Sequence, residues 1–339
     1  MFKKNILGIT LNICLVICLL LYFSSFIFAA EEKYVLKLAH YSMVGGQEDR
    51  TCHKFKEIAE ETSNGKLEVN IYPGGQLGDE TEIAQGVLMG TVPMAMVCPM
   101  DYREVVDGFG IDNLPFLFDS VNKSINIFNF SEIGKRLEER LIQKGVRILG
   151  WNTYGARHLI FSDKDVETYN DLQGLKLRSP ESDMFIKMFE SMGVRPTPIT
   201  WGEAYLSLQT GVADGMDTPI VDIKIMHFYE VAKYCLLTNH MLGNMILTIN
   251  EKTFQKLPSK LQEIVLYAGK EAINYINQEG KKEISETKKW LEEEGGVKFT
   301  ELKAEELEKF KKALMPVQKS WAEEHNCVDL LNDIIEIQK

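Results

Sequence analysis

The stretch that decides the fold begins with the nine residues LQGLKLRSP (172–180). Leucines alternate with basic residues between a glycine and a proline, which is the two-residue period of a short strand. Arg178 stands where this strand ends, and ligand-contacting groups usually lie at strand ends in open α/β sheets. A guanidinium there offers a planar set of donors that matches a carboxylate. A single arginine is more often a surface residue in a weak ion pair, so the surrounding sequence has to decide.

Three further motifs follow in order: PTPITWGEAY (196–205), LQTG (208–211) and DGMDTP (214–219). With the first stretch, their order and spacing resemble those of the solute-binding proteins of tripartite ATP-independent periplasmic (TRAP) transporters. That family includes binders of C4-dicarboxylates and of sialic acid. The resemblance extends from about residue 33 to about residue 321. It implies an α/β, two-lobed fold of the periplasmic-binding-protein type, with an interlobe cleft, a hinge and a long helix that spans both lobes.

The residue pattern points to the same fold class. A strand over 34–40, a helix over 48–63 and a strand over 67–73 form a β-α-β opening, which implies a parallel pair. A helical pattern runs from Pro258 to Glu294, 37 residues or about 55 Å, which exceeds one lobe. Other expected elements are a helix over 79–89, strands over 94–98, 146–151, 245–249 and 297–302, and a final helix over 305–324.

The resemblance also implies the division of the chain. Lobe I is expected at 31–153 with 241–280, lobe II at 154–240 with 281–302, and a C-terminal helical segment at 303–339. A short basic start precedes an apolar run from Ile6 to Ala30, which predicts an export signal over residues 1–30 and a periplasmic or extracytoplasmic protein. The length of the run leaves an uncleaved membrane anchor as an alternative.

Composition limits the partners. The chain has 38 basic and 49 acidic residues, a net charge of −11, which argues against nucleic-acid binding but not against a small anion in a locally positive pocket. The sequence has no Gly-x-Ser-x-Gly, no His-Glu-x-x-His and no Cys-x-x-Cys. We therefore expect no enzyme, no cofactor and no metal. The four cysteines after the leader favour free, mostly buried thiols: Cys52, Cys98, Cys235 and Cys327.

Site residues follow from the resemblance, position by position. Arg178 would hold a ligand carboxylate, and Arg157 would assist and connect binding to closure. In related proteins the acid matching Asp217 and the histidine matching His240 contact the second arginine and fix its orientation. Asp217 stands where glutamate is common, so its reach is one methylene shorter. Thr218 stands where many relatives have asparagine, which changes the hydrogen bonds available to a ligand.

Trp201 occupies a position that is often aromatic in the family and forms a wall of the pocket, although a core tryptophan is the alternative. Asp79 would cap a helix and Glu80 would suit the dipole of that helix, or both would face the ligand. The remaining ligand-binding candidates stand at strand ends that reach the cleft: His40, Tyr41 and Cys98.

The sequence thus predicts the extracytoplasmic solute-binding subunit of a TRAP transporter, a monomer that captures a small organic acid by cleft closure and delivers it to the membrane subunits. A sugar acid, a dicarboxylate or a related carboxylate would fit Arg178, and the acceptors Asp79, Glu80 and Asp217 favour a hydroxylated sugar acid. A membrane-anchored ligand sensor and an exported α/β hydrolase or lyase are the alternatives.

Overall fold

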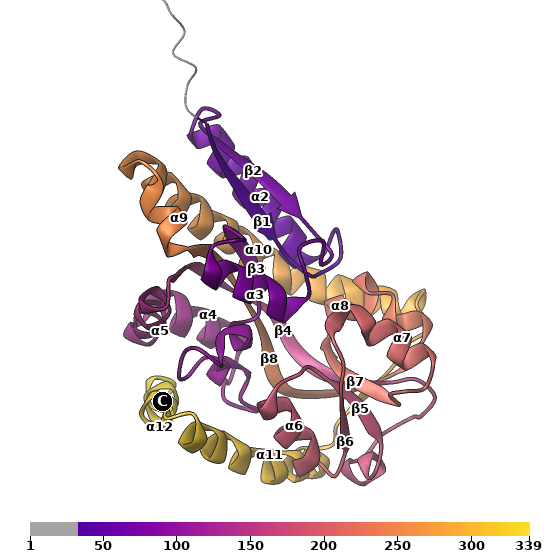
Figure 1. The fold of residues 1–339 in the computed structure, drawn as a ribbon. Coiled ribbons are helices and arrows are strands. Elements are labelled where there is room, and N and C mark those ends of the chain that lie inside the picture. The colour runs from indigo at the N-terminus through magenta and orange to yellow at the C-terminus, as the bar shows by residue number, and fades with distance from the viewer. Residues whose placement is uncertain (1–32) are drawn as a thin grey trace, which may run out of the picture. The chain divides into compact units, whose positions relative to one another are not determined.

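The computed structural model describes residues 33–339, which form one mixed sheet flanked by helices (Figure 1). In the described part of the chain the sheet has nine strands in the order β2-β1-β3-β8-β4-β7-β5-β6, with β9 paired to β8. The strands are β1 (Tyr34–Ala39), β2 (Leu67–Tyr72), β3 (Met94–Val97), β4 (Val146–Phe161), β5 (Lys176–Ser179), β6 (Arg195–Pro198), β7 (Gly215–Pro219), β8 (Tyr234–Asn250) and β9 (Lys298–Glu301). β1 pairs β3 in parallel, as a β-α-β opening requires.

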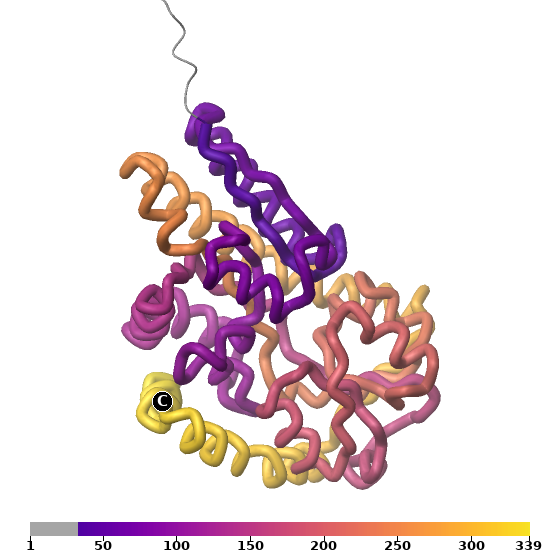
Figure 2. The backbone as a smooth tube through the Cα atoms, viewed as in Figure 1, coloured from indigo at the N-terminus to yellow at the C-terminus, as the bar shows by residue number. Residues whose placement is uncertain are grey.

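The two long strands, β4 and β8, join the two halves of the sheet. They are antiparallel and pair from Val146 opposite Asn250 to Phe161 opposite Tyr234, and they lie side by side in Figures 1 and 2. β3 pairs one end of β8 and β7 pairs the opposite end of β4. The sequence predicted only 146–151 and 245–249 as strands. That prediction was too short, because polar side chains interrupt the apolar pattern in the middle of both strands.

A glycine lies in the middle of β4, where the pairing of β4 with β8 is irregular. The register of β4 against β8 shifts between Thr153 and Ala156. Gly155 lies inside this shift with φ of 107°, and a Cβ there would come within 2.7 Å of the Ile284 side chain on the long helix α10. A larger residue would have to displace the end of the Ile284 side chain and would hold a strained backbone conformation at this φ.

Residues 33–339 contain eleven α-helices: α2 (Gln47–Thr62), α3 (Glu80–Met89), α4 (Val121–Phe130), α5 (Glu132–Gln143), α6 (Asp183–Ser191), α7 (Ala204–Gln209), α8 (Ile220–Ile225), α9 (Glu251–Lys256), α10 (Ser259–Glu293), α11 (Ala304–Glu324) and α12 (Val328–Ile337). The predicted long helix is confirmed as α10, which has 35 residues and packs against α2, β4 and α8. The prediction that the helix over 305–324 is the last one is wrong. Asn326, with a positive φ of 51°, follows the end of α11, and α12 comes after it.

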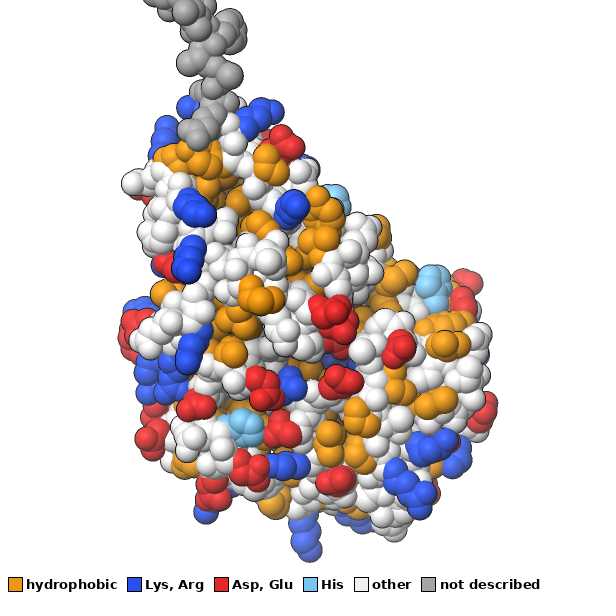
Figure 3. All heavy atoms as spheres, in the orientation of Figure 1, with side chains coloured by type: hydrophobic (Ala, Val, Ile, Leu, Met, Phe, Trp, Pro, Cys, Tyr) orange, Lys and Arg blue, Asp and Glu red, His pale blue; other side chains and the backbone are white. Residues whose placement is uncertain are grey.

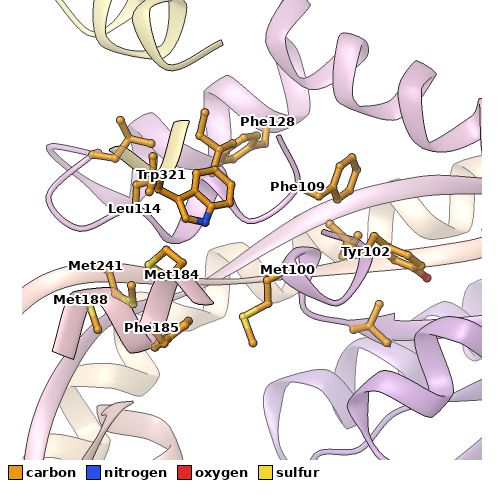
Figure 4. Close-up of a cluster of buried hydrophobic side chains, with 14 of the residues drawn as sticks. Met100, Tyr102, Phe109, Leu114, Phe128, Met184, Phe185, Met188, Met241 and Trp321 are labelled. Atoms are coloured by element: carbon orange, nitrogen blue, oxygen red, sulfur yellow. The ribbon is translucent and has the colours of Figure 1, made fainter. Parts of the chain in front are cut away.

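One buried cluster connects the C-terminal helices with the site. Figure 4 shows Trp321 of α11 beside Leu114 and Phe128, with Met184 and Phe185 of α6 in the same cluster. Trp321 is 1 % exposed. Phe185 also lines the main cavity, so packing of the C-terminal helices supports a wall of the site.

Val35–Lys339 is one compact unit, so the predicted limits of the lobes along the chain stay a prediction. Within residues 33–339 no helix is both long and apolar enough to cross a membrane. The four cysteines in this part are free thiols, and Cys98 is the one that is only half-buried. Basic and acidic side chains are intermixed on the face that Figure 3 draws. The predicted leader, residues 1–30, lies outside the described residues, as does the anchor alternative.

Candidate functional site

A cavity opens where the ends of β1, β3 and β5 meet the middle of β4 and β8. Its volume is about 50 Å³, below the range of roughly 300–1,000 Å³ that is usual for small-ligand sites, so the lining side chains lie close together in this structure. Six of the predicted site residues line it: Tyr41, Glu80, Cys98, Arg157, Arg178 and Trp201. The structure therefore brings together residues that lie up to 160 positions apart in the sequence.

Arg178 is the cation at the end of β5, and it is 1 % exposed. Its Nε donates to the Ile199 carbonyl at 2.9 Å, and this is the only hydrogen bond that its side chain makes to residues 33–339. In the same part of the chain no carboxylate lies within ion-pair distance of it. Its guanidinium lies 5.5 Å from the centre of the Trp201 ring. Burial lowers the pKa of Arg178 to about 10, although Glu80 acts in the opposite direction. Its terminal nitrogens are thus free to bind an anion in the cavity.

Arg157 on β4 is the second buried arginine, and it already has a partner. Its Nε donates to Asp217 Oδ2 at 2.5 Å and its Nη2 donates to the Asp217 carbonyl at 2.9 Å. Burial alone would lower the pKa of Arg157, but Asp217 outweighs burial and raises it. Burial likewise would raise the pKa of Asp217, and the guanidinium instead holds it well below its usual range. The predicted contact between Arg157 and Asp217 is therefore present despite the shorter side chain.

Two neighbours of this pair lie behind the cavity wall. His240 is fully buried, its Nδ1 shares a hydrogen bond of 2.7 Å with Thr238 Oγ1, and its Nε2 lies 3.6 Å from Asp217 Oδ2. In the described structure His240 therefore borders Asp217 and makes no hydrogen bond to Arg157. Thr218 and Asp217 are also fully buried, and neither lines the cavity. Direct ligand contacts of Thr218 and Asp217 stay a prediction that their positions do not favour.

The two acidic candidates at the start of α3 have different roles in the structure. Asp79 Oδ1 accepts from the Glu82 backbone nitrogen at 2.8 Å, and Glu82 Oε2 accepts from the Asp79 backbone nitrogen at 3.0 Å. Asp79 is thus a helix cap in a capping box, and it does not line the cavity. Glu80 does line the cavity, and its Oε1 accepts from the Trp201 backbone nitrogen at 3.1 Å. This bond ties α3 to the loop that carries the aromatic wall.

Of the three candidates at strand ends, Tyr41 and Cys98 line the cavity and His40 does not. His40 is fully buried behind the wall, with its Nε2 3.1 Å from Asp49 Oδ1, and burial lowers its pKa. Tyr41 does line the cavity, and its hydroxyl contacts the Met245 sulfur at 3.8 Å. Cys98 lines the cavity too, and burial raises the pKa of its thiol well above the ordinary value, so the neutral thiol is the stable form.

The cavity includes polar residues that the sequence reading missed: Glu48, Asn113, Tyr154, Asp222 and Asn244. Asn244 is held by contacts remote in sequence. Its Oδ1 accepts from Thr153 Oγ1 at 2.6 Å, and its Nδ2 donates to Asp112 Oδ2 at 3.2 Å. No local motif marks such residues, because their partners lie 91 and 132 positions away.

Comparison with known proteins gives this arrangement a family. Residues 40–325 match the family DctP, described as bacterial extracellular solute-binding protein, family 7. The chain belongs to the DctP family. This confirms the resemblance to TRAP solute-binding proteins that the motifs indicated.

Three relatives of this DctP-family chain illustrate the range of ligands. A TRAP periplasmic solute-binding protein from Sulfitobacter sp. NAS-14.1, solved with β-D-galacturonate, is 28 % identical with a TM-score of 0.84, covering 89 % of this chain and 100 % of that one. One from Chromohalobacter salexigens, solved with D-glucuronate, is 26 % identical with a TM-score of 0.84, covering 89 % and 99 %. The C4-dicarboxylate-binding periplasmic protein DctP of Rhodobacter capsulatus is 27 % identical over 87 % of this chain and 88 % of its own. These similarities confirm the two-lobed α/β fold of the family.

A histidine near the site makes stability depend on pH. His158 on β4 is 4 % exposed, and burial lowers its pKa to about 3, against about 6.5 in an unfolded chain. Below pH 6.5 the unfolded state therefore binds a proton that the folded state excludes, so this group destabilises the fold as pH falls toward 3. Between pH 7 and pH 5 it should cost about 2 kcal/mol of unfolding free energy.

Urea unfolding of the wild type and of His158→Gln at both pH values measures this cost. The pH-dependent loss should be smaller by that amount in His158→Gln. It should be unchanged in His227→Gln, whose side chain is 57 % exposed. Equal pH dependence in the wild type and His158→Gln would contradict a buried neutral imidazole.

Proposed function

We propose that this chain captures a small organic acid in the cavity and holds its carboxylate on the Nη atoms of Arg178. The observation that carries this proposal is the guanidinium itself, which is 1 % exposed, lines a cavity and has no anionic partner within ion-pair distance in residues 33–339. Burying a charge without a partner is costly, so such a group is expected where a ligand supplies the opposite charge. A carboxylate can take both terminal nitrogens at once.

The other lining groups shape the rest of the site. Arg157, fixed by Asp217, retains Nη1 as a donor toward the same anion. Trp201 offers a flat apolar face to the carbon skeleton of the ligand. Glu80 can accept a hydrogen bond from a ligand hydroxyl group through Oε2, because only its Oε1 bonds the Trp201 backbone nitrogen. The galacturonate- and glucuronate-bound relatives support a sugar acid as the ligand, and the R. capsulatus relative keeps a dicarboxylate as an alternative.

Capture of this kind serves transport. In this proposal the lobes close on the acid because both contact it, and the closed protein delivers it to the membrane subunits of a TRAP transporter. The protein works as a monomer outside the cytoplasm, without cofactor and without chemical conversion of the ligand. The periplasmic location of its structural relatives supports this placement.

A thermal-shift screen of the chain from Glu31 onward tests the proposal. The library holds dicarboxylates, 2-oxo acids, aldonic and uronic acids and sialic acid, with neutral sugars as the control set. A ligand that binds only the folded state raises the melting temperature in a concentration-dependent way, by about 2.7 kcal/mol of stability at 100 times its Kd. A shift confined to acids supports the proposal. A shift with neutral sugars alone, or with no compound, contradicts it.

A further inference from the structure

Two carboxyl groups that the carboxylate hypothesis does not use face the same cavity. Glu48 lies in the first turn of α2 and Asp222 lies in α8, so distant elements contribute them. Their residues are 5 % and 7 % exposed, and both line the cavity that Arg178 enters. Two buried acids are an unexpected lining for a pocket that binds an anion, because each repels a negative charge.

Neither acid is neutralised by a basic residue. In residues 33–339 no lysine, arginine or histidine lies within ion-pair distance of either carboxyl group, and the nearest arginines are already paired. Arg50 donates to Glu283 Oε2 at 2.7 Å, and Arg157 donates to Asp217. Burial and the Glu48 charge raise the pKa of Asp222, and burial raises the pKa of Glu48 against the influence of Arg50. A negative charge on Glu48 therefore makes ionisation of Asp222 less favourable.

The acidic pair and the free arginine have different charged neighbours. Glu80 is the charge that acts most on Arg178, whereas Asp222 is acted on by Glu48 and Glu283. Asp222 also lines the adjoining outer pocket together with Gln47 and Glu283. Since Arg178, Glu48 and Asp222 line one cavity, the other end of a ligand whose carboxylate is bound at Arg178 is expected to meet the two acids.

We infer that Glu48 and Asp222 form a charge filter that admits monocarboxylic acids with hydroxyl groups at the far end and rejects acids with a second carboxylate there. The inference rests on the proposed function, because it assumes one carboxylate on Arg178. A hydroxyl group donates a hydrogen bond to a carboxylate oxygen. A second ligand carboxylate has no proton to donate, and it adds a third acidic group beside a pair that already lacks a neutralising cation. The substrate class is thus polyhydroxy monoacids rather than dicarboxylates or aldaric acids.

Matched acids test the filter in the wild-type protein. Gluconate and glucarate differ only at carbon 6, where a hydroxymethyl group replaces a carboxylate, and galactonate and galactarate form a second such pair. Isothermal titration at pH 7.5 should give at least about tenfold tighter binding for the monoacid of at least one pair, since a single like-charge contact of this kind costs that much or more. Glucuronate, a second kind of hydroxylated monoacid, and succinate, a dicarboxylate without hydroxyl groups, should be titrated in the same way.

The double variant Glu48→Gln/Asp222→Asn removes both ionisable carboxyl groups at nearly constant shape. It should bring the two affinities of the discriminated pair close to parity, mainly through a gain for the diacid. Glu57→Gln, on the exposed side of α2, is the control and should keep the wild-type ratio. Circular dichroism should be used to check that each variant is folded. The ratio of monoacid to diacid affinity in the wild type tests the filter even if a variant fails to fold.

The outcomes separate the two proposals. Tighter binding of the monoacid, lost in the double variant, supports the filter. Equal or tighter binding of the diacids by the wild type, or an unchanged ratio in the folded double variant, overturns the filter and leaves acid capture intact. If the wild type binds none of these acids and no acid of the wider library, capture of an acid and the filter both fail.

Discussion

Replacing Arg178 with alanine should weaken binding of the captured acid by a factor on the order of 100 or more. The side chain is buried at the end of β5 and would supply a paired, charge-assisted contact, whose loss typically costs a few kcal/mol. Arg178→Lys should recover little of the affinity, because a single ammonium does not reproduce the two parallel donors of a guanidinium. Isothermal titration with the acid identified by thermal shift measures both effects.

The stability of the free protein distinguishes a binding residue from a structural one. Arg178 makes one hydrogen bond, to Ile199, and otherwise buries a charge, so Arg178→Met should leave the melting temperature of the ligand-free protein unchanged or higher. Arg147 is the control, since Glu251 pairs with its Nε at 2.8 Å and it does not line the cavity. Arg147→Met should keep the affinity. Unchanged affinity in Arg178→Ala, or a clear loss of stability in Arg178→Met, would contradict the assignment.

The part of the site that could be predicted from sequence consists of residues whose role is set locally. Arg178 ends a strand and Asp79 begins a helix, so period and capping chemistry point to them directly. Trp201 and Arg157 could be placed only because whole motifs resemble those of a family. Within the fold, α10 was predictable because an apolar stripe from Leu261 to Ile276 has helical spacing and no proline or glycine pair ends the pattern before Gly295.

The rest depends on tertiary contacts that leave no local pattern. Glu48 has the sequence features of an acid in the first turn of a helix, where the dipole alone explains a glutamate. Only the fold shows that it faces Asp222, 174 positions later. The central parts of β4 and β8 were missed for the same reason. Their polar residues, such as Asn152 and His240, break the alternation of a strand. They are buried because other elements, such as α10 and α4 against β4, pack on the paired strands.

Removing the carboxylate of Asp217 should destabilise the protein by about 3–5 kcal/mol, the usual cost of leaving a buried partner charge unpaired. Asp217 is fully buried, and Arg157 binds it through both a side-chain and a backbone oxygen. The pKa of Asp217 is lowered in the folded state, so the pair contributes its full stability above about pH 4, where an unfolded aspartate is also ionised. Below that pH the contribution declines. Urea unfolding of Asp217→Ala at pH 7 measures the loss.

A double variant shows whether the stability lost in Asp217→Ala comes from the unpaired Arg157 guanidinium or from altered packing. Arg157→Met/Asp217→Leu removes both charges and fills a similar volume, so it should regain most of the stability that Asp217→Ala loses. It should not regain ligand affinity, because the Nη1 donor of Arg157 is gone as well. The single variant should bind more weakly than the wild type even where it is fully folded, since nothing else in the described residues holds the Arg157 side chain by a hydrogen bond. If the double variant is as unstable as Asp217→Ala, packing around β4 and β7 sets the stability and the ion pair does not.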